Sequence, residues 1–503
     1  MIETIQQAVK PHDKYQVEIK LDYEFLEGKR TSYQVSTYIF VPQNLGINVH
    51  NYPKSHFYRD IQNYIRLKTP TLILRDFTEH STSPLATIEE IIAIENWAND
   101  PECKRLLISS LKFLSSMLKS SIREHFNLID KRISEAAPNS KIDLIIRSLV
   151  EEFLVESHKI VDKYRAFYPT FNLPNVDEQI FTSYQFTDES ISLLIEESSV
   201  EMFQIAENYL KKRSHKAEFQ HELSKCVQTE IKHRKSHGYA SILKDGEDNE
   251  EFIFRSSVLK KYASSVLYLS TDIRREGTAL EHVLFAAAAG ISMLFATLIA
   301  FDFQKRYGNF SFPFFAALVV GYMFKDRIKE LGRSFFSRYL QSTLYDRRIN
   351  IRTQDGKHKL GVLREKVSFV EEKDIPAAII HARNRDQITE LDNDWRGEHI
   401  ICYSKKIVLF NNAFKKVYAD APEITGINDI TRYDIRAYLN KMAEPVQERS
   451  YLDGSQLTTI TCHKVYHLNF LAMYKSLPQK EKIYKRIRLI LDREGIKRIE
   501  SVL

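Results

Sequence analysis

The sequence is poor in cysteine, which limits how the chain can be cross-linked. Only four cysteines occur among 503 residues, and no two of them lie close together. Small secreted domains depend on dense disulfide frameworks, whereas cytoplasmic thiols stay reduced. The scarcity of cysteine therefore disfavours a disulfide scaffold and indicates a cytoplasmic location for the polar parts of the chain.

Motifs for nucleotide or covalent chemistry are also missing. The chain holds no Gly-x-x-x-x-Gly-Lys-Ser/Thr loop, no Gly-x-Gly-x-x-Gly, no Gly-x-Ser-x-Gly and no Cys-x-x-Cys. Without a glycine-rich phosphate loop, a nucleotide-driven motor or a kinase is disfavoured. We expect a protein that uses no cofactor, and these absences favour a non-enzymatic protein without deciding against an enzyme.

Two further absences concern targeting and repetition. Residues 1–14 are polar and lack the apolar segment of a signal peptide, so an internal segment must direct any membrane insertion. No period of about 20 to 50 residues stands out, which disfavours a helical repeat array.

Against these absences stand two long uncharged runs. The first extends from His282 to Phe301 and the second from Tyr307 to Phe324, with a short polar turn around Asp302 between them. A helix needs roughly 20 apolar residues to cross a bilayer core of about 30 Å. The runs predict a transmembrane helical hairpin over residues 281–325. The alternative is a pair of helices buried in a soluble core.

Small residues recur every four positions along both runs, where they allow helix backbones to approach closely in lipid. Two uses are open: packing of the two helices against each other, or self-association of the whole protein through the hairpin. The predicted packing residues are Ala288, Ser292, Ala296, Ala300, Ala317 and Gly321.

Basic residues flank the hairpin much more densely than they occupy its turn, which favours both termini on the cytoplasmic side. The expected location is a bacterial inner membrane, crossed more than once. The basic residues expected to face lipid headgroups are Lys325, Arg327, Lys329 and Arg333.

The pattern of the remaining chain divides it into soluble regions around the hairpin. The predicted fold class is an α+β integral membrane protein with a helical bundle, a two-helix transmembrane hairpin and a C-terminal, mostly antiparallel α+β domain. The expected regions are a small α+β N-terminal region (1–86), a cytoplasmic helical bundle (87–240), a hinge with a juxtamembrane helix (241–280), the hairpin (281–325), a juxtamembrane basic helix (326–348) and the C-terminal cytoplasmic domain (349–503).

Alternation of apolar and polar residues predicts individual strands in the outer regions. Strands are expected at residues 15–21, 33–40, 400–409 and 459–474. A closing hairpin is expected from Ile487, with its turn at residues 492–495, and a short helix at residues 433–442.

Two groups of side chains suggest metal chemistry, and each has a simpler interpretation. Asp392 and Asp394 can hold a divalent cation through their carboxylates, although turns are rich in aspartate for backbone reasons alone. His233 and His237 share one helix face with Glu230, although this spacing is common by chance on solvated helices. The same helix carries His215, His221 and many basic residues. No metal site is assigned from these patterns.

These observations favour a membrane-anchored cytoplasmic scaffold or sensor that binds protein partners at the inner face of the membrane. Two alternatives remain. The first is a self-assembling effector that perturbs the bilayer, resembling a defence protein or a toxin in its action. The second is a membrane-tethered, metal-dependent enzyme that uses Asp392 and Asp394. The expected partners are the lipid bilayer and a protein, whereas nucleic acid is disfavoured because aromatic residues for base stacking are missing from the basic helix.

Overall fold

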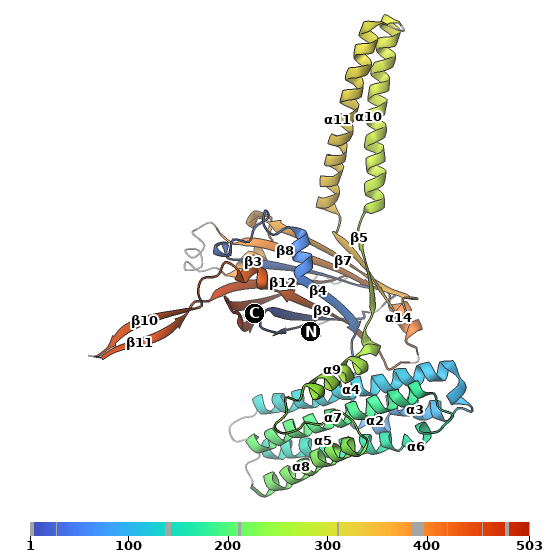
Figure 1. The fold of residues 1–503 in the computed structure, drawn as a ribbon, viewed down its shortest axis with the longest axis vertical. Coiled ribbons are helices and arrows are strands. Elements are labelled where there is room, and N and C mark those ends of the chain that lie inside the picture. Colours follow the sequence, from blue (N-terminus) through green and yellow to red (C-terminus); the bar gives the residue numbers. More distant parts are fainter. Residues whose placement is uncertain are drawn as a thin grey trace. The chain divides into compact units, whose positions relative to one another are not determined.

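Strands with alternating burial build the larger of two units in this computed structural model (Figure 1). The sheet unit comprises Met1–Ile65, Leu269–Phe414 and Asn428–Leu503, and the helical unit comprises Arg66–Tyr268 and Lys415–Ile427. The structure describes residues 5–26, 28–135, 142–209, 213–308, 311–384, 397–419, 421–454, 456–477 and 482–501.

The sheet unit contains an eight-stranded sheet, a four-stranded sheet and a separate two-stranded arm. The strand orders are β14-β13-β12-β3-β8-β7-β6-β5, β1-β2-β9-β4 and β10-β11. The strands are β1 (Ile5–Pro11), β2 (Gln16–Glu24), β3 (Thr31–Val41), β4 (Ile61–Leu67), β5 (Ser270–Arg275), β6 (Arg347–Arg352), β7 (Lys359–Val370), β8 (His399–Leu409), β9 (Gly426–Asp434), β10 (Val446–Asp453), β11 (Gln456–His463), β12 (Tyr466–Leu477), β13 (Lys482–Asp492) and β14 (Gly495–Ser501).

The two larger sheets pack face to face around one core. A single cluster of buried side chains joins Val17 of β2 and Tyr433 of β9 to Ile401 of β8 and Leu468 of β12. Because side chains alternate along a strand, each strand of the larger sheet has one face in this core and one face outside. We call the second face the outer face.

Strand β3 occupies the centre of the larger sheet. It pairs antiparallel with β8 on one side, where Tyr33 lies opposite Ile407, and with β12 on the other, where Val35 lies opposite Tyr474. The first and the last parts of the chain therefore share one sheet.

Short helices complete the sheet unit. The helix α12 covers one part of the outer face through Ile375 and Ile379, which pack on Phe40, Ile400 and Leu471. The bounds are α1 (Lys54–Asp60), α12 (Ala377–Arg383), α14 (Asn411–Val417) and α15 (Arg436–Leu439), with α14 crossing the boundary between the units.

Long amphipathic helices form the helical unit. Their starts carry ordinary caps: Ser83 accepts a hydrogen bond from the backbone N–H of Ala86, and Asp100 accepts one from that of Glu102. The helices are α2 (Asp76–Glu79), α3 (Pro84–Ile92), α4 (Pro101–Ser134), α5 (Ile142–Arg165), α6 (Tyr168–Phe171), α7 (Glu178–Tyr209), α8 (Arg213–Ser236) and α9 (Glu250–Ser264).

Two long antiparallel helices interrupt the sheet unit between β5 and β6. They are α10 (Thr278–Tyr307) and α11 (Phe312–Thr343), and they pack side by side along their length (Figure 1). We call this pair the α10–α11 hairpin.

The predicted two-helix transmembrane hairpin, and with it the integral membrane fold class, is wrong. Among the described residues, only α10 is long and apolar enough to cross a bilayer. The second uncharged run does not lie within one helix, since it begins at Tyr307, where α10 ends, and α11 begins only at Phe312. The uncharged part of α11 ends at Phe324, which leaves it shorter than a membrane span requires. The chain is an α+β protein with large antiparallel sheets, and a multi-pass topology is not supported.

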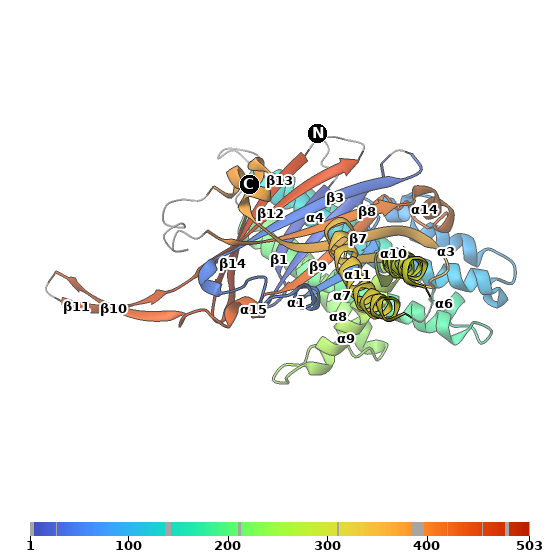
Figure 2. The same ribbon diagram turned by 90° about the horizontal axis from the view of Figure 1, so that it is seen from above.

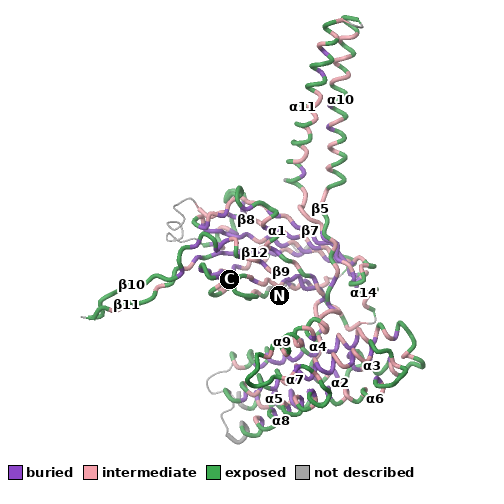
Figure 3. Tube along the Cα trace, viewed as in Figure 1, coloured by how far each residue is buried: buried purple, intermediate pink, exposed green. Residues whose placement is uncertain are grey.

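The arm formed by β10 and β11 projects away from the sandwich in both views (Figures 1 and 2). Every described residue of β10 is exposed, and most of β11 is exposed as well (Figure 3). Leu452 and Leu457, which face each other across the arm, are 71% and 72% exposed.

Candidate functional site

The small residues of the α10–α11 hairpin lie where its two helices approach each other. Ala288 and Ser292 of α10 are buried, as are Ala317 and Gly321 of α11. A Cβ atom built on Gly332 would lie 2.9 Å from the Cβ atom of Ala288, so the two backbones are as close as a glycine allows. The other two predicted packing residues, Ala296 and Ala300, are partly buried.

Large apolar side chains cover the outside of the α10–α11 hairpin, and their exposure ranges from 40% at Phe295 to 81% at Phe312. Only 11% of the most apolar stretch of α10 is buried (Figure 3). A contiguous exposed apolar surface of this kind marks a site of interaction with lipid or protein. The exposed side chains are Val283, Ile291, Met293, Leu294, Phe295, Leu298 and Phe301 on α10, and Phe312, Phe315, Leu318, Val319, Val320, Tyr322, Met323, Phe324, Leu331, Phe335 and Tyr339 on α11.

The basic residues predicted to face headgroups follow this apolar surface on α11. Arg327 and Arg333 are exposed, and Lys325 and Lys329 are partly exposed. The ammonium of Lys325 lies 4.1 Å from the centre of the Tyr322 ring, and the Arg333 guanidinium lies 5.5 Å from that of Phe285. Aromatic and basic groups thus meet where the apolar part of α11 ends.

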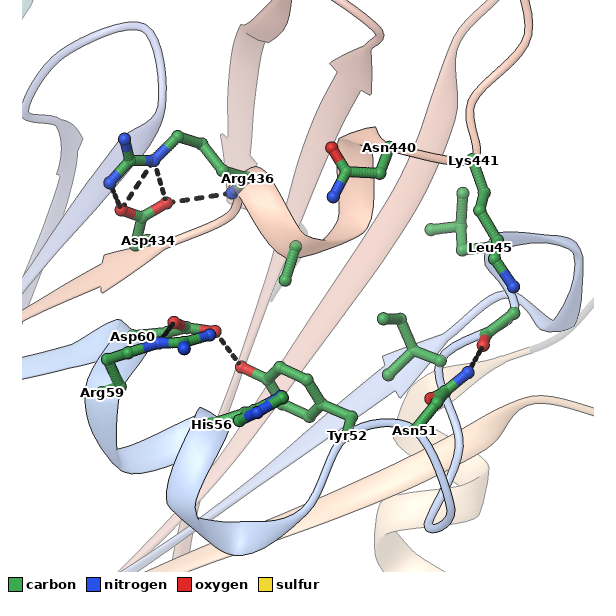
Figure 4. Close-up of a pocket in the computed structure, with 13 residues that line it drawn as sticks. Leu45, Asn51, Tyr52, His56, Arg59, Asp60, Asp434, Arg436, Asn440 and Lys441 are labelled. Carbon is green, nitrogen blue, oxygen red and sulfur yellow. Dashed lines mark hydrogen bonds and ion pairs between the residues drawn. The ribbon is translucent and has the colours of Figure 1, made fainter.

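An open pocket of about 480 Å³ lies in the sheet unit between α1, α15 and the loop before α1 (Figure 4). Its charged groups pair with each other. Asp434 accepts hydrogen bonds from Arg436 at 2.9 and 3.0 Å, and Asp60 accepts one from Tyr52 at 2.6 Å. Burial raises the pKa of Asp434, but the hydrogen bonds from Arg436 outweigh burial and hold that pKa below its usual value.

The remaining polar lining suits recognition of a small polar molecule. His56, Asn51, Asn440 and Lys441 surround an apolar floor that includes Leu45. This pocket could not be predicted from the sequence, because its residues come from segments nearly 400 positions apart and none of them belongs to a recognisable motif.

A buried polar network lies between the two large sheets. Lys405 of β8 donates hydrogen bonds to Asp429 and to Thr431 of β9, both at 2.8 Å. Glu365 of β7 accepts hydrogen bonds from Tyr403 and from an amide side chain of β4, both at 2.6 Å. Burial raises the pKa of Glu365, although the charge of Lys405 and the hydrogen bond from Tyr403 oppose the rise.

This network was also missed, although the sequence carries a signal for it. In the alternating strand around Lys405, that lysine falls on the same face as Ile401, Tyr403 and Ile407, all of which are buried. A charged residue in phase with core residues indicates a buried partner of opposite charge. Through these contacts the network joins β4, β7, β8 and β9 between the two sheets.

The histidines of α8 do not gather around a metal site in the part of the chain that the structure describes. His233 and His237 have their ring centres 4.2 Å apart, but His233 bonds Asp188 at 2.7 Å. Glu230 instead accepts two hydrogen bonds from Arg165, at 2.7 and 3.1 Å. Glu230, His233 and His237 share one helix face, but they do not bind a common partner.

A second buried network lies in the helical unit and is centred on Asp188. Besides His233, it accepts hydrogen bonds from Arg165 at 3.2 Å and from Tyr239 at 3.0 Å. Burial would raise the pKa of Asp188, but the hydrogen bond from His233 and the charge of Arg165 outweigh it and lower the pKa. These contacts tie α5, α7 and α8 together.

Three residues considered for metal binding from the sequence have side chains outside the described part of the chain. Asp392 and Asp394 lie outside the described residues, and so does the side chain of His215. His221 is exposed on α8.

Comparison of the chain with protein-family models, with curated proteins and with solved structures gives no significant match. The function therefore has to be argued from the surfaces and networks described above.

Proposed function

We propose that the protein is a non-enzymatic scaffold that attaches to a lipid bilayer through the distal part of the α10–α11 hairpin. Its other exposed surfaces then bind protein partners near the membrane. The proposal keeps the function expected from the sequence but does not require the chain to cross the bilayer twice.

The observation that carries the proposal is the apolar surface of the hairpin. A protein groove covers one stripe of an amphipathic helix, whereas the exposed apolar side chains of α10 extend beyond a single stripe. Met293, Leu294 and Phe295 are consecutive, so their side chains point roughly 100° apart around the helix, and they are 57%, 61% and 40% exposed. Lipid is the environment that accommodates a helix with so little polar surface.

Aromatic residues at the end of the hairpin support the same environment. Phe301, Tyr307 and Phe312 are 64%, 53% and 81% exposed close to the turn between α10 and α11. Aromatic side chains are enriched at the boundary between lipid and water, where an apolar ring can meet polar headgroups. The ion pair between Asp302 and Arg306 places charge at the same end.

Two observations support a scaffold rather than an enzyme. In the pocket of the sheet unit, the carboxylates of Asp434 and Asp60 pair with the guanidinium of Arg436 and the phenol of Tyr52. The β10–β11 arm presents exposed strand edges and two leucines, which is the type of surface that adds strands or side chains from a partner.

Flotation of the purified full-length chain with phosphatidylcholine vesicles tests the attachment. The variant Leu298→Lys/Val319→Lys places two charges on the apolar surface at positions that are 60% and 45% exposed, so folding is preserved. Since a lysine within the hydrocarbon costs roughly 2.5 to 3.5 kcal/mol, we expect vesicle binding to fall by more than about tenfold.

The matched control is Leu452→Lys/Leu457→Lys, which makes the same type of change on the arm at positions that are 71% and 72% exposed. It should float like the parent. A parent protein that does not float, or an arm variant that loses flotation as much as the hairpin variant, would falsify the proposal.

A further inference from the structure

One row of side chains on the outer face of the eight-stranded sheet is almost entirely basic. The register places its members directly opposite one another on seven neighbouring strands, from β5 to β13. Lys and Arg make up 72 of the 503 residues, so seven positions chosen at random would hold one. We call this set the basic row: Arg274, Arg348, Arg364, Lys406, Gln34, Lys475 and Lys482.

Most of this charge is not neutralised by ion pairs among the described residues. Arg274 pairs with Asp272 at 2.9 Å and Arg364 with Glu276 at 3.0 Å. The other four basic side chains of the row form no ion pair with any residue that the structure describes.

Arg348 is the clearest case of unsatisfied charge in the row. Its Nε atom is buried and has no hydrogen-bond partner among the described residues, and its neighbours on both sides are arginines. Like charges directly opposite each other destabilise a sheet. The effect reaches Lys359, whose pKa is lowered by burial and then by the charges of Arg348, Arg352 and Arg274. An anionic ligand bound at the basic row would relieve this repulsion.

The position of the row indicates which anion this is. The strands β5 and β6, which hold Arg274 and Arg348, lead directly into α10 and out of α11. The hairpin rises on the side of the larger sheet that faces away from the four-stranded sheet, and that side is the outer face (Figure 1). The apolar hairpin and the basic row are therefore presented in the same direction.

We infer that the basic row binds the anionic headgroups of the bilayer to which the hairpin attaches. This inference rests on the proposed attachment and adds the lipid class to it. Basic residues next to a membrane attract acidic lipids, and several of them act together. A nucleic acid is the less favoured anion, because no member of the row is aromatic and bases could not stack there.

The experiment compares flotation with phosphatidylcholine vesicles and with vesicles that also contain phosphatidylglycerol. The full-length variant Arg348→Gln/Lys406→Gln/Lys475→Gln removes three unpaired charges from the row. We expect it to bind the anionic vesicles roughly 100-fold more weakly than the parent and to bind the phosphatidylcholine vesicles equally well. The preference of the parent for anionic vesicles should also fall as salt is added.

The matched control is Lys225→Gln/Lys232→Gln/Lys235→Gln, which removes the same number of charges from exposed positions on α8. It should retain the preference for anionic vesicles. Loss of the preference in this control as well would show that net charge, and not the row, is responsible, and would overturn the inference.

Other outcomes separate the inference from the proposed function. A parent that binds both kinds of vesicle equally overturns the inference alone, since the hairpin still attaches. A parent that binds neither kind overturns both. A row variant that binds anionic vesicles like the parent, but loses binding to a single-stranded oligonucleotide, overturns the lipid assignment in favour of nucleic acid.

Discussion

Neighbouring lysines of β8 show how burial decides what a residue does. Lys405 is 3% exposed and bonds Asp429 between the two sheets, whereas Lys406 is on the outer face and lies opposite Arg364. The alternation of the strand sends two chemically identical side chains to opposite faces. One lysine is a structural counter-charge, and the other is free to meet a ligand.

Lys405→Met should be strongly destabilising, because it leaves the carboxylate of Asp429 buried without its cation. Loss of one partner of a buried ion pair costs about 3 to 5 kcal/mol, and urea unfolding measures it. Removing the cation that opposes the raised pKa of Glu365 also raises that pKa further. The loss of stability should therefore be smallest in acid, where Glu365 is protonated, and should grow as the pH rises.

The control for this change is Lys406→Met, one residue away on the outer face. It should alter the free energy of unfolding by no more than about 0.5 kcal/mol. Equal losses for the two variants would show that Asp429 does not depend on Lys405.

At the scale of elements, small residues of the α10–α11 hairpin allow its two helices to pack closely. Ala288 of α10 and Gly332 of α11 meet where a larger side chain would not fit. Gly290 of α10 differs from Gly332 of α11, since it is exposed and a Cβ atom built on it has nothing within 4 Å. The position of a glycine on its helix therefore decides whether a larger side chain can be accommodated there.

Gly332→Leu should push α10 and α11 apart. Overpacking of this kind costs about 1 to 3 kcal/mol, and amide hydrogen exchange of the two helices should report a loss of protection of that size. Gly290→Leu makes the same change where space is open and should leave protection unchanged. If both variants exchange alike, the contact between Ala288 and Gly332 does not hold the pair together.

At the scale of the whole molecule, the sheet unit is assembled from distant parts of the chain. Its three segments are separated by the helical unit, and β3 joins them by pairing with β8 and β12. The α10–α11 hairpin and the β10–β11 arm are insertions that leave this sheet continuous. A deletion should therefore be judged by whether it removes a central strand or an insertion.

Deleting residues 1–41 removes β3 and leaves β8 and β12 without their shared neighbour. The larger sheet should then fail to form, with loss of cooperative thermal unfolding measured by circular dichroism. Replacing residues 446–463 by a short turn removes only the exposed arm and should shift the melting temperature little. A cooperative melt after the first deletion would show that β3 is dispensable.

Local pattern predicted many elements well. The strands expected at residues 15–21, 33–40 and 400–409 lie mainly within β2, β3 and β8, and the closing hairpin appears as β13 and β14. The expected strand at residues 459–474 is two strands, since β11 ends at His463 and β12 begins at Tyr466. The expected helix at residues 433–442 was too long, because β9 reaches Asp434 and α15 spans Arg436–Leu439.

The limits of local pattern are clearest in the hairpin. The absence of charge from Tyr307 to Phe324 predicted a second membrane helix, but charge alone does not say where a helix begins. The boundary at Phe312 depends on Ser311, which caps α11 by accepting a hydrogen bond from the N–H of Phe314, and on Pro313 in the first turn.

The sequence by itself determined the alternating strands, the long helices and the apolar character of α10, because each follows from the order of neighbouring residues. Only the tertiary structure decided that β3 lies between β8 and β12, that Lys405 meets Asp429, and that residues from Gln34 to Lys482 form one basic row. Strand pairing joins residues hundreds of positions apart, and it is set by packing of the whole sheet, which no local pattern encodes.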